Sequence, residues 1–223
     1  MPQALTLTSL PLFPLSTVLY PGGLLPLQIF EVRYLDMVGK AYKAGAPFGI
    51  VSLSQGEEVQ RIAAAPDALP QATSGAFAQE IFHSVGTLAT ITEFSAPQAG
   101  LLVIQCLGTQ RFEIDRRERL KHGLWVADIT YLPEDTPVQI PADLQAGADA
   151  LARVIEGLQS RSGASGSMPL QSPYQLQDCG WVANRWCELL PLPPALKQRM
   201  MALDNPLVRL ELVNDLLVKM QII

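Results

Sequence analysis

The sequence predicts an α+β fold in which a mostly antiparallel sheet, closed as a barrel or stacked as a sandwich, precedes an α-helical bundle. In residues 1–135, short segments rich in β-branched and aromatic residues alternate with glycine, proline and charge, which is typical of strands. After Pro141 the apolar period changes from two to 3.6, which indicates helices. The chain has 223 residues, 48% hydrophobic and 17% charged, enough for one large core or two modest ones. We therefore predict a sheet part, residues 1–135, and a helical part, residues 136–223.

The stretch from Pro11 to Val38 combines prolines, a glycine pair and an apolar run, and we interpret its first half as two strands bent around a tight corner. Pro14, Pro21 and Pro26 fit strand ends, edges or bulges, because proline has no N–H to donate to a neighbouring strand. The pair Gly22-Gly23 supplies a turn with freedom at positive φ.

A helix is expected between Glu31 and Gly45, where apolar residues recur three or four positions apart. Gly45 is suited to end it, because glycine tolerates the left-handed conformation that closes many helices. Phe30 and Tyr34 are predicted to pack this helix onto the sheet.

The carboxylate of Glu31 lies at the start of this helix, where free N–H groups and the helix dipole stabilise negative charge. A charged group so close to an apolar run needs a partner. We expect Glu31 to form an ion pair with Arg33 or with Arg111.

Further strands are predicted in five short segments. They are FGIVSLS from Phe48, VGTLATITEF from Val85, GLLVIQCLG from Gly100, RFEI from Arg111 and WVADITYL from Trp125.

The segment Ser54–Gln79 is too long and too rich in alanine, proline and glycine for an ordinary turn. Loops of this length are either functional or mobile, and both readings stay open. Its apolar residues Ile62 and Phe77 are our candidates for contacts with a bound peptide.

The helical part begins with an amphipathic helix of about five turns. Its apolar stripe consists of Leu144, Ala148, Leu151, Ile155 and Leu158. A small-residue connector follows from Ser162, and further helices are expected in LQDCGWVANRWCELL, after Pro193-Pro194 and in NPLVRLELVNDLLVKM. In the last of these, Asn205 is a suitable N-cap and Pro206 a suitable first residue.

Charge and cysteine content narrow the class of protein. The net charge of −5, with a pI near 5.0, disfavours general attraction to nucleic acid or to anionic membranes. Three scattered cysteines, Cys106, Cys179 and Cys187, argue against a disulfide framework and favour a reducing compartment. No secretion signal or apolar run of about 20 residues is evident, so we expect a cytoplasmic protein without a membrane anchor.

Motifs for catalysis, metal binding or cofactor binding are not evident in the sequence. It contains no phosphate-binding loop, no G-x-S-x-G elbow and no C-x-x-C or H-E-x-x-H pair. We interpret His83 and His122 as structural or solvated, and the acid pairs Glu57-Glu58 and Glu134-Asp135 as solvated loop charge. We therefore predict no catalytic residue, no metal ligand and no cofactor.

The motifs PLFPL, PLQIFEVRY and GTQRF, followed by the helical end LPLPPALKQRMMALDNPLVRLELV, resemble the Lon amino-terminal domain family. The resemblance runs from about Leu10 to Leu217, and Val32 departs from it where the family often has proline. It implies a PUA-like β-barrel with one helix after its second strand, joined to a helical bundle. The positions that carry the family motif are Pro14, Pro21, Gly22, Pro26, Phe30, Glu31, Arg33, Tyr34, Gly108, Arg111 and Phe112.

The resemblance implies substrate recognition, since this domain is the substrate-binding region of Lon-type ATP-dependent proteases and also occurs alone. We expect the chain to lack the ATPase and protease modules, and so to be a non-enzymatic module that binds unfolded or partly exposed protein segments. A separate ATPase or protease is an expected partner. The oligomeric state is left open.

Two alternative functions come from other classes. RNA binding would use the locally basic segment Arg111–Lys121, which its interleaved acids make more typical of a solvated hairpin tip. A small-ligand protein or an enzyme would use a pocket between barrel and bundle, although no converging titratable groups are evident in the sequence.

Overall fold

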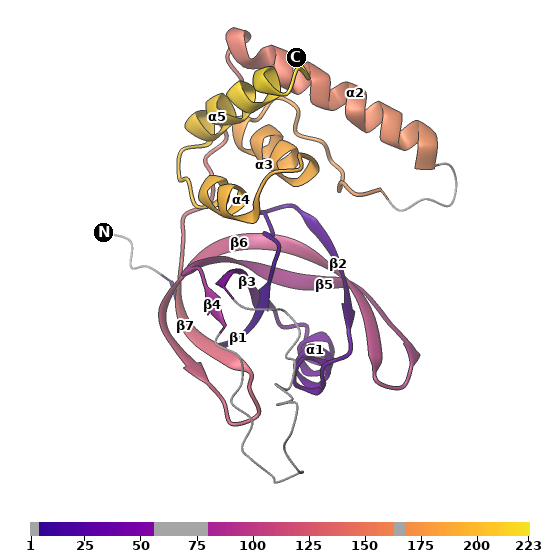
Figure 1. The fold of residues 1–223 in the computed structure, drawn as a ribbon, viewed down its shortest axis with the longest axis vertical. Coiled ribbons are helices and arrows are strands. Elements are labelled where there is room, and N and C mark those ends of the chain that lie inside the picture. The colour runs from indigo at the N-terminus through magenta and orange to yellow at the C-terminus, as the bar shows by residue number, and fades with distance from the viewer. Residues whose placement is uncertain (1–4, 56–79, 163–167) are drawn as a thin grey trace, which may run out of the picture.

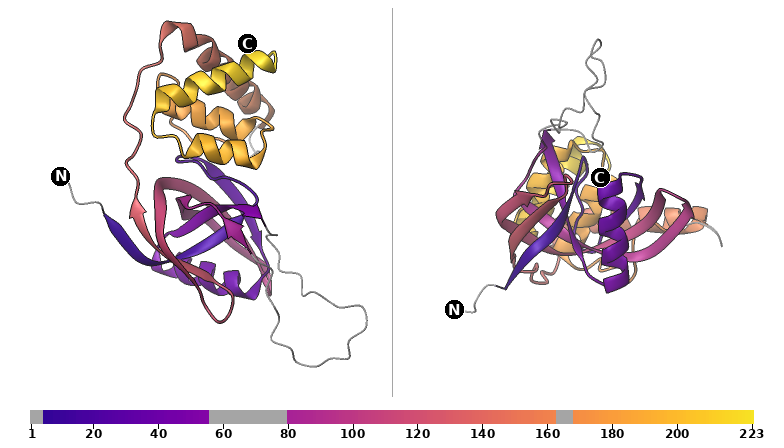
Figure 2. Two further views of the ribbon diagram at one scale, coloured as in Figure 1. Left: turned by 60° about the vertical axis from the view of Figure 1, so that its left-hand side comes forward. Right: turned by 90° about the horizontal axis from the view of Figure 1, so that it is seen from below.

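A computed structural model describes residues 5–55, 80–162 and 168–223 of the chain. Ile62 and Phe77 lie outside these ranges, so their proposed contacts stay predictions. The strands form one end of the molecule and the four C-terminal helices the other, as the views in Figures 1 and 2 agree. The predicted α+β class, a mostly antiparallel sheet followed by a helical region, is confirmed. The boundary at residue 135 stays a prediction.

The sheet has seven strands, and five of them close into a ring. The strand order is β1-β7-β6-β5-β3-β4, and a parallel pairing of β1 with β3 closes the ring. Strand β2 pairs with β6 outside this ring, so the sheet as a whole is not a simple barrel. The strands are β1 (Thr6–Leu15), β2 (Leu24–Ile29), β3 (Phe48–Gln55), β4 (Ile81–Phe82), β5 (Val85–Gln98), β6 (Leu101–Arg119) and β7 (Trp125–Tyr131).

Strand β6 is one continuous strand of 19 residues, whereas the sequence suggested two segments separated near Gly108. Gly108 does not break the strand, because the space beside its backbone is filled by the preceding turn. A Cβ at this position would lie 2.2 Å from the carbonyl oxygen of Tyr20. Glycine is therefore required at position 108 by the close packing of the turn against β6.

The predicted corner is present where the chain passes from β1 to β2. Gly22 has φ +73° and donates to the Gly108 carbonyl at 2.8 Å, while Gly108 donates to the Gly23 carbonyl at 2.8 Å. Two residues of this turn thus face one residue of β6, as in a β-bulge. By the alternation of antiparallel pairs, the ring of Pro26 then lies at a position whose nitrogen faces away from β6. Pro26 therefore costs the sheet no hydrogen bond.

Helix α1 (Val32–Ala44) follows β2 and ends, as predicted, at Gly45 with φ 59°. Tyr34 is 1% exposed and its ring stacks on Phe13 at a centroid distance of 4.0 Å. The prediction for Phe30 is wrong, because its side chain is 56% exposed. The preceding Ile29 takes the inward position at the end of β2, so the next residue points outward.

The helical part consists of a short 3-10 turn and four α-helices. Its caps follow the sequence: the Asn205 side chain accepts from Leu207 N and Val208 N, and Pro206 occupies the first turn. The Asp178 side chain caps the helix that begins at Cys179 by accepting a hydrogen bond from Trp181 N. The elements are η1 (Ala142–Leu144), α2 (Gln145–Ser162), α3 (Cys179–Leu189), α4 (Pro194–Met201) and α5 (Pro206–Lys219).

The core of the bundle includes residues from the N-terminal segment. Val18 and Tyr20 pack with the buried stripes of α2, α3 and α5, and Tyr20 donates to the Lys197 carbonyl at 2.6 Å. All three cysteines are buried and free. Within the described ranges, no helix has the length and apolar character needed to cross a membrane.

Replacing Gly108 by alanine is expected to lower the free energy of unfolding by about 3 kcal/mol, because the new Cβ meets backbone atoms that have no room to move. Gly157 is the matched control, since its helical position in α2 leaves a Cβ in open space. There Gly157→Ala should stabilise by about 0.5–1 kcal/mol. Urea unfolding of the two variants measures both effects, and equal stabilities would contradict this account.

Candidate functional site

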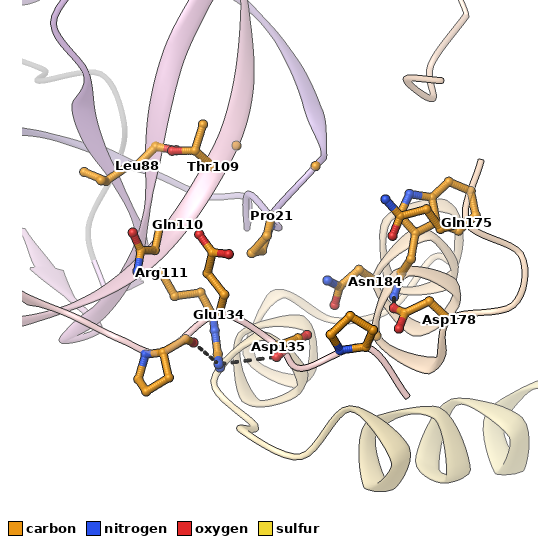
Figure 3. A pocket seen from close by; sticks show the side chains of 16 residues that line it. Pro21, Leu88, Thr109, Gln110, Arg111, Glu134, Asp135, Gln175, Asp178 and Asn184 are labelled. Carbon is orange, nitrogen blue, oxygen red and sulfur yellow. Dashed lines mark hydrogen bonds and ion pairs between the residues drawn. The ribbon is translucent and has the colours of Figure 1, made fainter. Parts of the chain in front are cut away.

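Two hollows of different character lie near the family-motif residues. The interface cleft, about 490 Å³, separates the sheet from the bundle (Figure 3). The β2 groove, about 180 Å³, runs beside β2 and the start of α1. The cleft is lined by Pro21, Gly22, Leu88, Gly108, Thr109, Gln110, Arg111, Pro133, Glu134, Asp135, Pro137, Gln175, Asp178, Gly180, Trp181 and Asn184. The groove is lined by Phe13, Leu15, Pro26, Leu27, Gln28, Ile29, Phe30, Glu31 and Tyr34.

Arg111 crosses from β6 toward the bundle at one wall of the interface cleft. Its guanidinium donates to the carbonyls of Met201 and Leu203, both at 3.1 Å, and lies 3.5 Å from the Asp135 carboxylate. The residue is 4% exposed, and burial lowers the pKa of its guanidinium. Its expected place in a solvated hairpin tip is therefore wrong, because the strand buries it and only the later basic residues approach the tip.

Asp135 joins the two parts of the molecule. Its carboxylate receives two bonds from Arg209 of α5, at 2.5 and 3.1 Å, in addition to the contact with Arg111. Arg209 also donates to the Asn184 amide oxygen at 3.0 Å and to the Leu203 carbonyl. The interpretation of Asp135 as solvated loop charge is thus wrong, while its neighbour Glu134 is exposed as expected.

Arg185 and Glu188 of α3 pack directly against the turn between β1 and β2. Its guanidinium is fully buried and donates to the carbonyls of Pro21, at 2.8 Å, and Gly22. It also pairs with Glu188 at 2.9 Å, and Glu188 Oε1 occupies the space where Gly23 would carry a Cβ. A side chain on Gly23 would push the turn off the bundle.

Sequence reasoning missed Arg185 and Arg209. The available signal was a single basic residue within the apolar stripe of each helix, in GWVANRWCELL and NPLVRLELV. A basic residue on a buried face requires a partner. Only Glu188, three residues after Arg185, could be seen locally as a partner, whereas the Pro21 and Gly22 carbonyls and the Asp135 carboxylate lie far away in the chain.

The Glu-x-Arg-Tyr motif forms a second buried charge cluster. Arg33 lies 3.0 Å from Glu31 and 2.9 Å from Glu80, and donates to the Gly123 carbonyl at 2.8 Å. Glu80 in turn accepts from the Trp125 indole at 2.7 Å. The predicted ion pair of Glu31 is therefore confirmed with Arg33, not with Arg111. The cluster ties the start of α1 to the β6–β7 hairpin.

The β2 groove has an exposed apolar side chain in its lining. Phe30 is 56% exposed, while Phe13, Ile29 and Tyr34 form a buried floor. Val32, the next residue but one after Phe30, does not line the groove but is 81% exposed at the start of α1. Among the described residues β2 pairs as a strand only with β6, so its other edge has no strand beside it. Only an isolated bridge between Gly23 and Leu170 flanks the start of this edge.

The cysteines and the candidate metal ligands of the described residues show no sign of reactivity. Burial raises the pKa of the Cys106 thiol to about 12 and that of Cys187 to about 11, which suppresses the thiolate at neutral pH. In the same ranges, no three His, Cys, Asp or Glu side chains gather as metal ligands.

Asp135→Asn should lower the free energy of unfolding by about 3 kcal/mol, because two buried guanidinium groups would lose their shared carboxylate. Asp36→Asn is the control, since the Asp36–Lys40 pair on α1 is exposed. Its cost should stay below about 0.5 kcal/mol. Chemical denaturation distinguishes the two, and a small effect at Asp135 would contradict the role assigned to it.

Glu188→Gln should flatten the dependence of stability on pH. Burial raises the Glu188 pKa from 4.5 to about 7, against the lowering effects of Arg185 and Lys197. The native protein therefore loses stability as pH rises from about 5 to 8, on the order of 2 kcal/mol, because the unfolded chain ionises first. The variant lacks this term, and any lost bond to Arg185 adds an offset that is independent of pH. Parallel slopes in urea unfolding at pH 5 and 8 would refute the assignment.

Residues 9–219 match the family described as the ATP-dependent protease La (LON) substrate-binding domain. The crystal structure of a Lon N-terminal domain protein from Xanthomonas campestris is similar, with a TM-score of 0.67 and 28% identity over 93% of this chain and 97% of that one. The N-terminal domain of a Mycobacterium avium complex Lon protease shares the fold, with a TM-score of 0.54 and 17% identity over 93% and 96% of the two chains. No curated protein sequence matches.

The family match spans nearly the whole region in which the motifs were recognised, and the related structures contain both the sheet and the helical end. The resemblance inferred from the sequence is thereby confirmed. The chain belongs to the LON substrate-binding domain family.

Proposed function

We propose that the chain is a non-enzymatic recognition module that binds exposed apolar segments of other proteins. The family, whose description names substrate binding, supports this proposal at the level of a Lon-like recognition module. The match is to the substrate-binding domain. The sequence motifs of the Lon ATPase and protease modules are not evident in the chain, in agreement with a role in binding.

The observation that carries the proposal is the β2 groove. It combines an apolar floor with the exposed side chain of Phe30, and Val32, exposed at the adjacent start of α1, extends the apolar surface beyond the groove. Covering such side chains releases about 25 cal/mol for each Å² of apolar surface, which is sufficient to favour an apolar partner. The adjacent edge of β2 presents backbone groups to an extended segment.

The preferred partner is an unfolded or partly exposed polypeptide, and we place the interaction in the cytoplasm, with a separate ATPase or protease as a further partner. RNA binding is less well supported, because burial of Arg111 removes one cation from the basic segment and the net charge is −5. Arg117 of that segment packs over Phe82, with its guanidinium carbon 4.5 Å from the ring centroid.

The double variant Phe30→Ser and Val32→Ser should weaken binding of a reduced, unfolded client protein at least fivefold, because it removes the exposed apolar side chains in and beside the groove. Both side chains are exposed, so the free energy of unfolding should change little. Val218→Ser on α5 is the matched control, with 54% exposure at a distant surface. Fluorescence anisotropy with a labelled client measures the affinities.

Equal loss in the double variant and in the Val218 control would refute the groove as the binding surface. Absence of binding to every member of a panel of unfolded clients would refute the proposed function itself. A client that is shortened by the pure protein would refute the non-enzymatic part of the proposal.

A further inference from the structure

The interface cleft contains polar groups that the recognition of apolar segments does not use. Four charged residues line it: Glu134, Asp135, Asp178 and Arg111. Asp135 is neutralised by Arg111 and Arg209. Glu134 has no hydrogen bond or ion pair with any described residue and is exposed. In Figure 3 the carboxylates of Glu134 and Asp135 come from the linker that joins sheet and bundle.

Asp178 is also satisfied, by backbone donors. It accepts from Trp181 N at 2.7 Å and from Val138 N at 3.0 Å at the start of α3. The helix N-terminus is therefore capped by the protein itself. This leaves Glu134 as the one lining carboxylate without a partner among the described residues, so its charge is available to a cationic ligand.

Asn184 supplies a donor on the facing wall. The residue is 5% exposed, and its amide oxygen is used by Arg209 at 3.0 Å. Its amide nitrogen has no acceptor among the described residues and borders the cleft, on the side opposite Glu134 (Figure 3). The nitrogen is therefore a donor that faces the cleft and is open to an acceptor oxygen of a ligand.

Apolar surface separates these two polar groups. The apolar lining of the cleft includes Trp181, Leu88 and the rings of Pro21 and Pro137. Gly22 and Gly180 line it as well. Its volume of about 490 Å³ is within the range of about 300–1,000 Å³ typical of small-molecule sites. The arrangement has the shape and chemistry for an elongated group with a cation at one end and an oxygen acceptor at the other.

We propose that the interface cleft binds a basic amino-acid residue, arginine or lysine, with its cationic group at Glu134 and its carbonyl or carboxylate oxygen at the Asn184 amide. The aliphatic stem lies against Trp181 and the prolines. The same chemistry is offered by a free basic amino acid and by a basic residue within a polypeptide. This site is separate from the β2 groove and does not rest on the proposed function.

The test is a titration of the full chain, labelled with ¹⁵N, with L-arginine and with a short polar peptide that carries one central arginine. L-Citrulline, which has the same shape without the charge, is the neutral control for the ligand. The indole N–H of Trp181 and the side-chain amide of Asn184 report on the cleft. Glu134→Gln tests the charge, and Glu156→Gln, on the exposed face of α2, is the matched control.

Saturable shifts at both reporters are expected with arginine, with citrulline at least tenfold weaker. Glu134→Gln should weaken arginine binding at least fivefold and Glu156→Gln should leave it unchanged. Tighter binding of the free amino acid identifies a small-molecule site, and tighter binding of the peptide identifies a second contact for polypeptides. Equal binding of arginine and citrulline, an unaffected Glu134→Gln variant, or no saturable shift would overturn the proposal.

Discussion

Two buried guanidinium groups, Arg111 of the sheet and Arg209 of the bundle, share the carboxylate of Asp135, and the placement of one part on the other depends on this contact. Unpaired, each charge would carry a large desolvation penalty, so the parts are held where all three groups meet. Arg185 adds a second anchor by binding the carbonyls of Pro21 and Gly22. These contacts fix the positions of the two parts whose residues line the interface cleft.

The local sequence pattern was sufficient to predict most helices and strands. It was insufficient where contacts with backbone far away in the chain determine the residue. The end of α1 at Gly45 and the cap at Asn205 follow from neighbouring residues, and both were predicted. Gly108 resembled a break because its true cause, the Tyr20 carbonyl, lies almost ninety residues earlier in the chain. Phe30 was predicted to be buried because it lies four residues before Tyr34, a helical spacing. At this junction, however, the alternation of the strand still holds, and because Ile29 points inward, Phe30 points outward.

The candidate site was harder to predict than the fold. Sequence motifs identified Glu31, Arg33 and Arg111 as special and predicted the pair of Glu31 with Arg33, but not the contacts of Arg33 with Glu80 and Gly123 or those of Arg111. Arg111 serves the interface, while Arg33 serves the junction of α1 with the β6–β7 hairpin. The polar lining of the cleft comes from the linker, β6, α3 and the segment before α3, so its composition depends on packing that periodicity does not encode. The two hollows consequently differ, one apolar and open at an edge, the other mixed and enclosed by both parts.

We propose above all that this family member recognises polypeptide at the β2 groove and leaves it chemically unchanged. Hydrogen exchange with mass spectrometry, recorded with and without an unfolded client, tests this most directly and also reports the client's intact mass. The account predicts slower exchange in β2 and the first turn of α1, with the client mass unchanged. Protection confined to other elements, or a client cut into fragments, would contradict it.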